Sequence, residues 1–145
     1  MKLEEIRREW EKDSVIDKTE LAVESLKIPI LHSKYYNIYI QEAVRHRKFI
    51  GEQKILLRKI FEYYSGEMSL EEMKVNNLEI FQRKLLKSDI EKYISSDKAV
   101  IEMDLKVGIQ RETIDFLESI LKNINNRSFI ISNAIAFLKF QNGGN

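Results

Sequence analysis

The sequence predicts an all-α fold, built on a long kinked helix and a C-terminal helical region. Apolar residues recur at helical spacing along most of the chain. The 145 residues include one proline and five glycines, so few positions would interrupt a helix. The chain is 43% hydrophobic, which suits a folded rather than a disordered protein. Its length fits one domain.

The first half of the chain is expected to hold a short helix followed by a long one. Residues 2–12 are charge-dense and read as the short helix. Asp17, with Glu20 three residues later, fits a capping box, and a helical pattern continues from there to Gly66. Pro29 lacks a backbone donor, so we expect it to kink or briefly break the long helix. Gly66 is expected to end it.

Shorter helical segments are expected next. Ser69 and Glu72 predict a second capping box, which would open a short helical turn. Another helical segment is predicted over residues 76–95, divided near Ser88. The stretch 99–110 alternates with the period of a strand, but its apolar residues also fit one face of a helix. We favour a helix or an extended linker there, because no second strand is visible to pair with it.

The C-terminal segment places two apolar faces on one helix. The main stripe consists of Leu117, Ile120, Leu121, Ile124, Ile131, Ile135 and Leu138. A second set, Phe116, Ile130, Phe137 and Phe140, lies off that stripe. Two apolar faces need two surfaces to cover them. The helix is therefore either a central core helix or one shared between the core and a neighbouring subunit. In the second case the main stripe and Phe116 would support assembly. Gly143 and Gly144 are expected to end the helix.

The charge pattern conceals a local basic segment. The chain has 24 Lys+Arg and 23 Asp+Glu. Between positions 45 and 59 it has six cations and one acid, Glu52, so this segment is strongly positive while the remainder is negative. The six candidate polyanion-binding residues are Arg45, Arg47, Lys48, Lys54, Arg58 and Lys59.

A helical projection narrows this segment to one line. With Arg47 at zero and about 100° per residue, Lys54 and Arg58 fall within about 20° of it, and Gly51 lies between them. The principal apolar stripe falls on the opposite side. Lys48 and Lys59 lie on the flank.

This line of cations has three interpretations: a solvated surface, a site for nucleic acid, or a site for an acidic protein partner. Lys54 and Arg58 repel each other at i,i+4 spacing, where a merely solvated face usually mixes signs. Gly51 costs roughly 0.5–1 kcal/mol in mid-helix and would let a strand approach closely. Tyr36 and Phe61 bracket the line and could stack bases. We expect the neighbouring Tyr63 and Tyr64 to be core residues instead.

No catalytic or metal-binding pattern is visible. The five glycines do not form a phosphate-binding loop, and no hydrolase motif is present. Cysteine is absent, and His32 and His46 lack the spacing of metal ligands. We therefore expect no enzyme, no metal and no cofactor. The absence of a long apolar run or a signal-peptide pattern leads us to expect a cytoplasmic protein with no membrane span.

Five segments resemble the UvsY family, the recombination mediators of T-even-like bacteriophages. They are residues 13–17 (DSVID), 33–35 (SKY), 57–66 (LRKIFEYYSG), 126–129 (NRSF) and 137–140 (FLKF). The resemblance covers essentially the whole chain and is most specific at YYSG preceded by basic residues. The family's DNA-contacting segment maps onto Lys54 and Arg58. One position departs from the family pattern of two cations before the aromatic pair, because Ile60 stands where the second is expected.

The resemblance implies a non-catalytic homo-oligomer, a ring of six or seven subunits assembled through the C-terminal helical region. Such mediators bind single-stranded DNA, contact the phage single-strand-binding protein and load a RecA-like recombinase in the host cytoplasm. Residues 1–66 would then carry DNA binding and residues 67–145 assembly, with one compact unit also possible. The alternative is a helical scaffold or adaptor protein whose basic strip binds an acidic protein partner.

Overall fold

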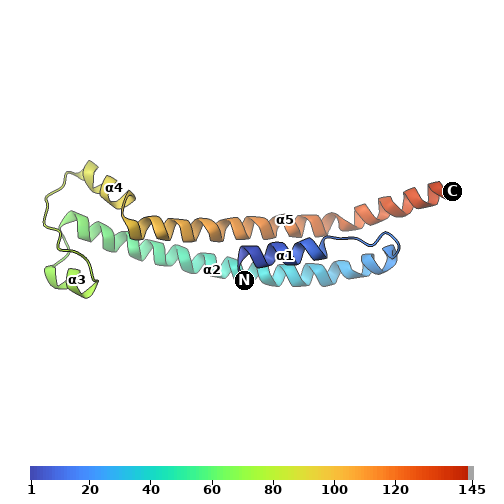
Figure 1. Cartoon of the computed structure of the whole chain (residues 1–145), viewed down its shortest axis with the longest axis horizontal. Helices are drawn as coiled ribbons and strands as arrows, with labels where there is room; N and C mark the ends of the chain where they lie inside the picture. Colours follow the sequence, from blue (N-terminus) through green and yellow to red (C-terminus); the bar gives the residue numbers. More distant parts are fainter. Residues whose placement is uncertain (144–145) are drawn as a thin grey trace. The chain divides into compact units, whose positions relative to one another are not determined.

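Five helices account for the secondary structure of residues 1–143, the part of the chain described by the computed structural model (Figure 1). They are α1 (Leu3–Asp13), α2 (Leu21–Ser65), α3 (Leu70–Val75), α4 (Lys87–Ser95) and α5 (Lys98–Gln141). These residues contain no strand. The predicted all-α class is confirmed.

The chain forms two compact units, each made of segments from both long helices. Unit 1 combines Met1–Val44 with the chain from Gln110 onward, and unit 2 comprises Arg45–Ile109. These two units are defined by which residues pack together. The expected division into residues 1–66 and 67–145 concerns DNA binding and assembly, and it stays a prediction.

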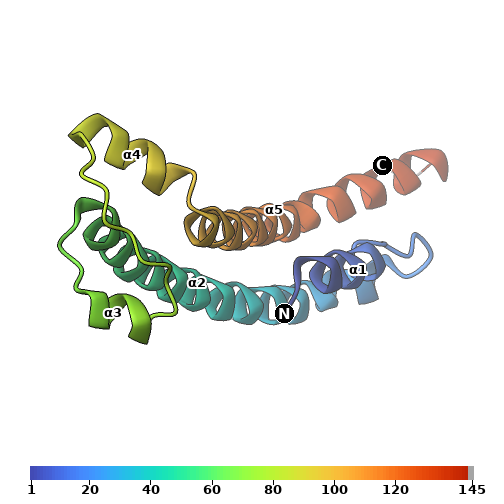
Figure 2. The same cartoon turned by 60° about the vertical axis from the view of Figure 1, so that its left-hand side comes forward.

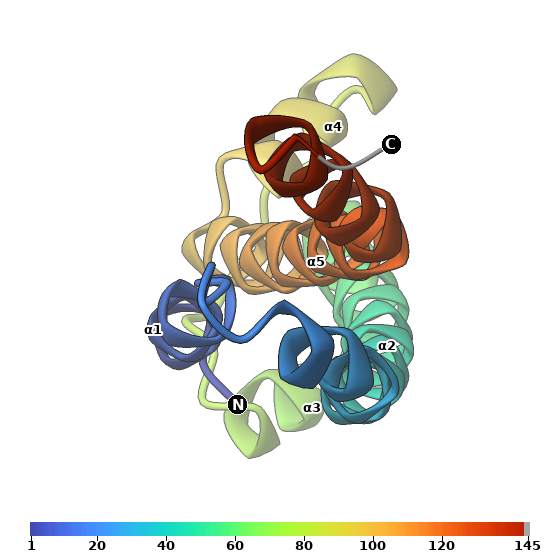
Figure 3. The same ribbon diagram turned by 90° about the vertical axis from the view of Figure 1, so that its right-hand side faces the viewer.

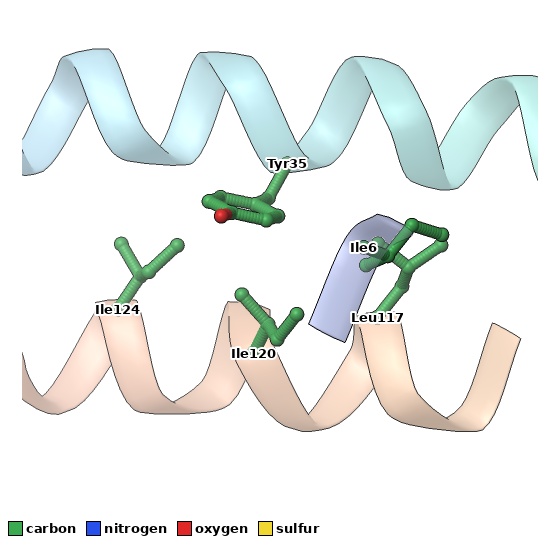
Figure 4. Close-up of a cluster of buried hydrophobic side chains, with 5 residues drawn as sticks. All are labelled: Ile6, Tyr35, Leu117, Ile120 and Ile124. Atoms are coloured by element: carbon green, nitrogen blue, oxygen red, sulfur yellow. The ribbon is translucent and has the colours of Figure 1, made fainter. Parts of the chain in front are cut away.

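The core of unit 1 lies between α1, the first half of α2 and the second half of α5 (Figure 3). Ile6, Tyr35, Leu117, Ile120 and Ile124 are at most 1% exposed. Figure 4 shows Tyr35 directed from α2 toward Ile120 and Ile124, with Ile6 beside Leu117. Burying such side chains contributes about 1.5–3 kcal/mol each, so this cluster is the main source of stability in unit 1.

A polar cluster attaches the end of α1 to α2. Asp13 accepts hydrogen bonds from Lys34 Nζ at 2.6 Å and from Tyr35 Oη at 2.8 Å. Lys34 also bonds Glu9 at 2.9 Å. Burial opposes ionisation of Asp13, but the bonds from Lys34 and Tyr35 outweigh it and lower the carboxyl pKa. The bonds that Lys34 donates to Asp13 and Glu9 hold the pKa of Lys34 above its usual value.

A buried arginine of α5 fixes the connection between α1 and α2. Arg127 is 1% exposed and donates hydrogen bonds to the carbonyl oxygens of Ser14 at 3.5 Å and Val15 at 3.1 Å. Its Nη2 lies 3.3 Å from Glu24 Oε2. Glu24 also pairs with Lys27 at 2.9 Å, and the bond from Lys27 is the largest influence lowering the pKa of Glu24.

Unit 2 is organised around an aromatic cluster. Tyr63 and Tyr64 near the end of α2 pack against Phe81, and Tyr93 of α4 completes the group, with ring centroids 4.9–5.9 Å apart. Tyr63 Oη donates to the Glu79 carbonyl at 2.7 Å, and Tyr64 Oη donates to Asp97 at 2.7 Å. Tyr63 and Tyr64 are therefore core residues, as predicted.

Most of the expected helix boundaries are present. Gly66 ends α2 with φ +83°, in the left-handed region that glycine adopts readily. Ser69 caps α3, because its Oγ accepts a hydrogen bond from the N–H of Glu72 at 3.2 Å. The stretch 99–110 is helical and lies within α5. This helix ends at Gln141, and Gly143 follows with φ +70°. Gly144 lies outside the described residues.

Three local predictions differ from the structure. The helix α2 begins at Leu21 rather than at Asp17, whose carboxylate accepts from the N–H and hydroxyl of Thr19 and closes a turn. It then runs through Pro29, so the expected break is absent there, whereas the expected kink stays a prediction. Residues 78–86 are not helical, because the aromatic cluster holds Phe81 and the preceding Asn77 has φ 55°.

Candidate nucleic-acid interface

The predicted basic segment forms one side of α2 within unit 2. The opposite side of the helix packs inward: Ile60 is 2% exposed and Tyr63 is 7% exposed. Gln53 on this inner side donates to Asp104 of α5 at 2.8 Å. The packing fixes the rotation of α2 and leaves the basic line in solvent.

The line itself contains three exposed cations. Arg47, Lys54 and Arg58 are all exposed, and Arg47 and Arg58 are about 16 Å apart along the axis at 1.5 Å per residue. Lys48 is exposed on the flank, and Lys59 is half-buried there. These five residues share one broad surface of the helix.

Arg45 does not belong to this surface. It is exposed, but it projects about 160° from Arg47, on the side of the helix that packs. Ile60, where the family pattern has a second cation, belongs to the core of unit 2. The structure therefore brings together five of the six predicted cations.

The acids near the line do not cancel its charge. Glu52 faces α5, where Lys106 Nζ lies 3.3 Å from Glu52 Oε2 and also 4.2 Å from the centroid of the Phe49 ring. Arg58 pairs with Glu62 at 3.2 Å, but the Arg58 side chain is 84% exposed. Such surface pairs contribute only about 0.3–0.5 kcal/mol, so a phosphate can displace this one. Among residues 1–143, Arg47, Lys48, Lys54 and Lys59 form no ion pair.

Two uncharged residues shape the same surface. Gly51 is exposed, and a Cβ placed there would have no neighbouring atom within 4 Å. The ring of Phe61, beside the line, is 45% exposed and so available for stacking on a base. Chemically, the surface suits a flexible anion that uses its phosphates more than its base edges.

The predicted assembly residues are distributed over two environments. Leu117, Ile120, Ile124 and Ile131 are buried in unit 1, and Phe116 and Leu121 pack against this core. They therefore have a structural role within one chain, and their part in assembly stays a prediction. Ile135 and Leu138 are 37% and 41% exposed. Their exposed neighbours are Phe129, Ile130, Phe137 and Phe140.

Two other kinds of site, a metal centre and a membrane span, are absent from the described part of the chain. The His, Asp and Glu side chains of residues 1–143 nowhere gather into a group that could hold a metal ion. None of the described helices combines the length and hydropathy that a membrane span requires.

An all-helical fold with a continuous line of exposed cations defines a class of helical proteins suited to binding a polyanion. Comparison with known proteins identifies the family within that class. Residues 9–144 match the model of the family described as "Recombination, repair and ssDNA binding protein UvsY". The chain belongs to the UvsY family, which confirms the resemblance found in the sequence.

A curated relative and two crystal structures agree with this assignment. The chain is 27% identical over 143 residues to the recombination protein uvsY of Enterobacteria phage T4, covering 99% of each chain. Two crystal structures of the bacteriophage T4 recombination mediator protein UvsY match with a TM-score of 0.84 each. Their identities are 25% and 26%, over 97% of this chain and 99% and 98% of theirs.

Proposed function

We propose that this protein is a recombination mediator that binds single-stranded DNA through the basic line of α2. The observation that carries the proposal is the set of exposed cations, Arg47, Lys54 and Arg58, in a chain whose family is described as binding single-stranded DNA. The mediator displaces the single-strand-binding protein and loads a RecA-like recombinase. It works in the host cytoplasm and catalyses no reaction itself.

Binding by this surface is largely electrostatic. Each phosphate that meets a cation releases condensed counterions, so affinity falls as salt rises. If the five cations of the line and its flank all engage, the log–log salt slope is about −3.5 per protomer for a single strand. Base specificity is low, because charge contacts and stacking on Phe61 carry little sequence information.

Assembly supports the same function by multiplying weak contacts. A ring of six or seven copies presents six or seven basic lines to one strand, and each further contact is intramolecular. The exposed apolar residues in the last turns of α5 are the surface we propose for assembly, because the buried part of the stripe is already used within the chain.

Replacing Lys54 and Arg58 by alanine tests the DNA site. Affinity for a labelled oligothymidylate should fall roughly tenfold or more, and the salt slope should move from about −3.5 to about −2 per protomer. Fluorescence anisotropy over a salt series measures both quantities. Both side chains are exposed, so the helix content should not change.

The matched control removes the same charge elsewhere in unit 2. Lys92 and Lys98 are exposed and lie outside the basic line. Alanine at both positions should leave the affinity and slope near those of the unmodified protein. If the two double variants lose affinity equally, or if Lys54→Ala with Arg58→Ala binds normally, α2 is not the DNA site.

A further inference from the structure

The connection between α3 and α4 carries unused backbone hydrogen-bonding groups. Residues 78–86 form neither helix nor strand (Figure 2). Within residues 1–143, no N–H group from position 79 to 86 donates a hydrogen bond to another backbone group. An exposed run of this kind can pair with an extended chain, as an edge strand does.

This connection is nevertheless held in place. Phe81 packs 5.2 Å from Tyr64 and 5.9 Å from Tyr93, measured between ring centroids. Arg83 Nη1 donates to Tyr93 Oη at 3.2 Å, and the Glu79 carbonyl accepts from Tyr63. A segment that is already fixed loses little entropy when a partner binds.

A groove of about 550 Å³ with a mixed polar and apolar lining lies beside the connection in unit 2. Its apolar lining is Met68, Leu70, Met73, Phe81 and Leu85. Methionines adapt their shape to an inserted side chain, which suits a groove that receives a partner. The charged residues that line it are both cations, Arg83 and Lys84.

We propose that this groove and the connection bind an extended acidic segment of a partner protein. The segment would pair its backbone with residues 79–86 and insert an apolar side chain into the groove. Its carboxylates would meet Arg83 and Lys84 in charge-assisted hydrogen bonds. The two cations supply the charge complementarity that selects an acidic occupant.

The same observations favour a polypeptide over a second nucleic-acid site. Ile80 and Leu86 are 63% and 72% exposed, and aliphatic side chains of this kind contact a peptide but do not stack on bases. The ring that the connection itself contributes, Phe81, is occupied by its aromatic neighbours. None of the residues lining the groove belongs to the basic line of α2. The proposal therefore adds a partner surface to the DNA-binding function.

The test uses fluorescein-labelled peptides of about ten residues, rich in Asp and Glu around a central Leu or Phe, binding to the full-length protein. A second panel has Lys at the acidic positions, and an oligothymidylate serves as the nucleic-acid probe. Acidic peptides should bind the unmodified protein more tightly than their Lys counterparts. Arg83→Glu with Lys84→Glu should weaken that binding roughly tenfold or more and leave oligothymidylate affinity within about twofold.

Two further variants keep the test decisive. Lys84→Glu alone retains the bond from Arg83 to Tyr93 and should still weaken peptide binding. Lys87→Glu with Lys92→Glu makes the same charge change on α4, outside the groove lining, and should weaken it less. The proposal is overturned if acidic peptides bind no better than basic ones, or if the groove variants bind them normally. It is also overturned if those variants lose oligothymidylate affinity instead.

Discussion

Asp13, Lys34 and Tyr35 show at the residue scale what two of the family-like segments do. Asp13 belongs to the segment 13–17, and Lys34 and Tyr35 belong to the segment 33–35. In the fold they form one hydrogen-bonded cluster that joins α1 to α2. Arg127, from the segment 126–129, bonds the carbonyl oxygens directly after Asp13. These segments therefore connect the elements of unit 1. The sequence alone shows that the segments are present in one chain but not that they contact one another.

Removing the Tyr35 hydroxyl should destabilise the protein in a pH-dependent way. The hydroxyl bonds the Asp13 carboxylate from a fully buried ring, so Tyr35→Phe should cost about 1–2 kcal/mol of unfolding free energy at pH 7. In the folded protein the pKa of Asp13 lies below its ordinary value of 3.8. The Asp13 carboxylate therefore contributes fully to the unfolding free energy at pH values above 3.8. The contribution is lost as the pH falls through the folded pKa. The difference in unfolding free energy between Tyr35→Phe and the unmodified protein should therefore become smaller below about pH 4.

Urea unfolding at several pH values measures this difference. The single tryptophan, Trp10, packs edge-on against Tyr35 at 5.3 Å and provides a fluorescence signal from the site. Tyr36→Phe is the matched control, because that ring is 45% exposed, and it should change the stability little. A Tyr35→Phe effect that stays constant from pH 7 to about pH 3 would show that the Asp13 bond does not cause it.

At the scale of elements, local chemistry predicted the end of α2 at Gly66 and the beginning of α3 at Ser69, but not the beginning of α2 or the non-helical residues 78–86. Gly66 and Ser69 act through their own backbone or side chain, so the sequence alone placed them. The start of α2 depended on whether Asp17 bonds to Thr19 or caps a helix, and the two patterns look alike in sequence. Residues 78–86 have a helical pattern but lie in a tertiary aromatic cluster. Neighbours distant in sequence overrode local preference there.

Arg127 makes an element-scale prediction, because one side chain joins the α1–α2 connection, α2 and α5. Arg127→Met removes the two carbonyl bonds and leaves buried Glu24 paired with Lys27. Removing one partner of a buried ion pair typically costs about 3–5 kcal/mol of unfolding free energy. Because Glu24 keeps its pair with Lys27, we expect a loss of about 3 kcal/mol here. Changing Glu24→Gln in the same chain should recover part of the loss.

Equilibrium urea unfolding measures the unfolding free energies of these variants. The exposed Arg111 on the same helix provides the control. Arg111→Met deletes the same charge from a solvated site and should change stability by less than about 0.5 kcal/mol. Equal losses from Arg127→Met and Arg111→Met would contradict a structural role for the buried arginine.

At the scale of the whole molecule, the exposure of the candidate DNA surface was more predictable than the exposure of the apolar stripe on α5. A helical projection separates the solvent side of α2 from its packed side, so Arg47, Lys54 and Arg58 could be grouped without coordinates. The same projection could not show which part of the apolar stripe on α5 is buried and which part is exposed. Leu117 and Leu138 occupy one stripe, but α1 and α2 cover the first and leave the second partly exposed. Which part of a stripe is covered depends on the tertiary fold.

The last turns of α5 provide the final prediction, which concerns assembly. The side chains of Phe137 and Phe140 are 58% and 78% exposed, and patches of large apolar residues of this kind mark interaction sites. Phe137→Glu with Phe140→Glu should convert the proposed assembly to smaller species in light scattering, while the helix content measured by circular dichroism stays the same. Weaker oligothymidylate binding should accompany the smaller mass, because fewer basic lines then meet one strand. Lys139→Glu changes charge in the same turns without removing apolar surface, so it should retain the mass. A Phe137→Glu, Phe140→Glu protein of unchanged mass would show that this helix end does not hold the subunits together.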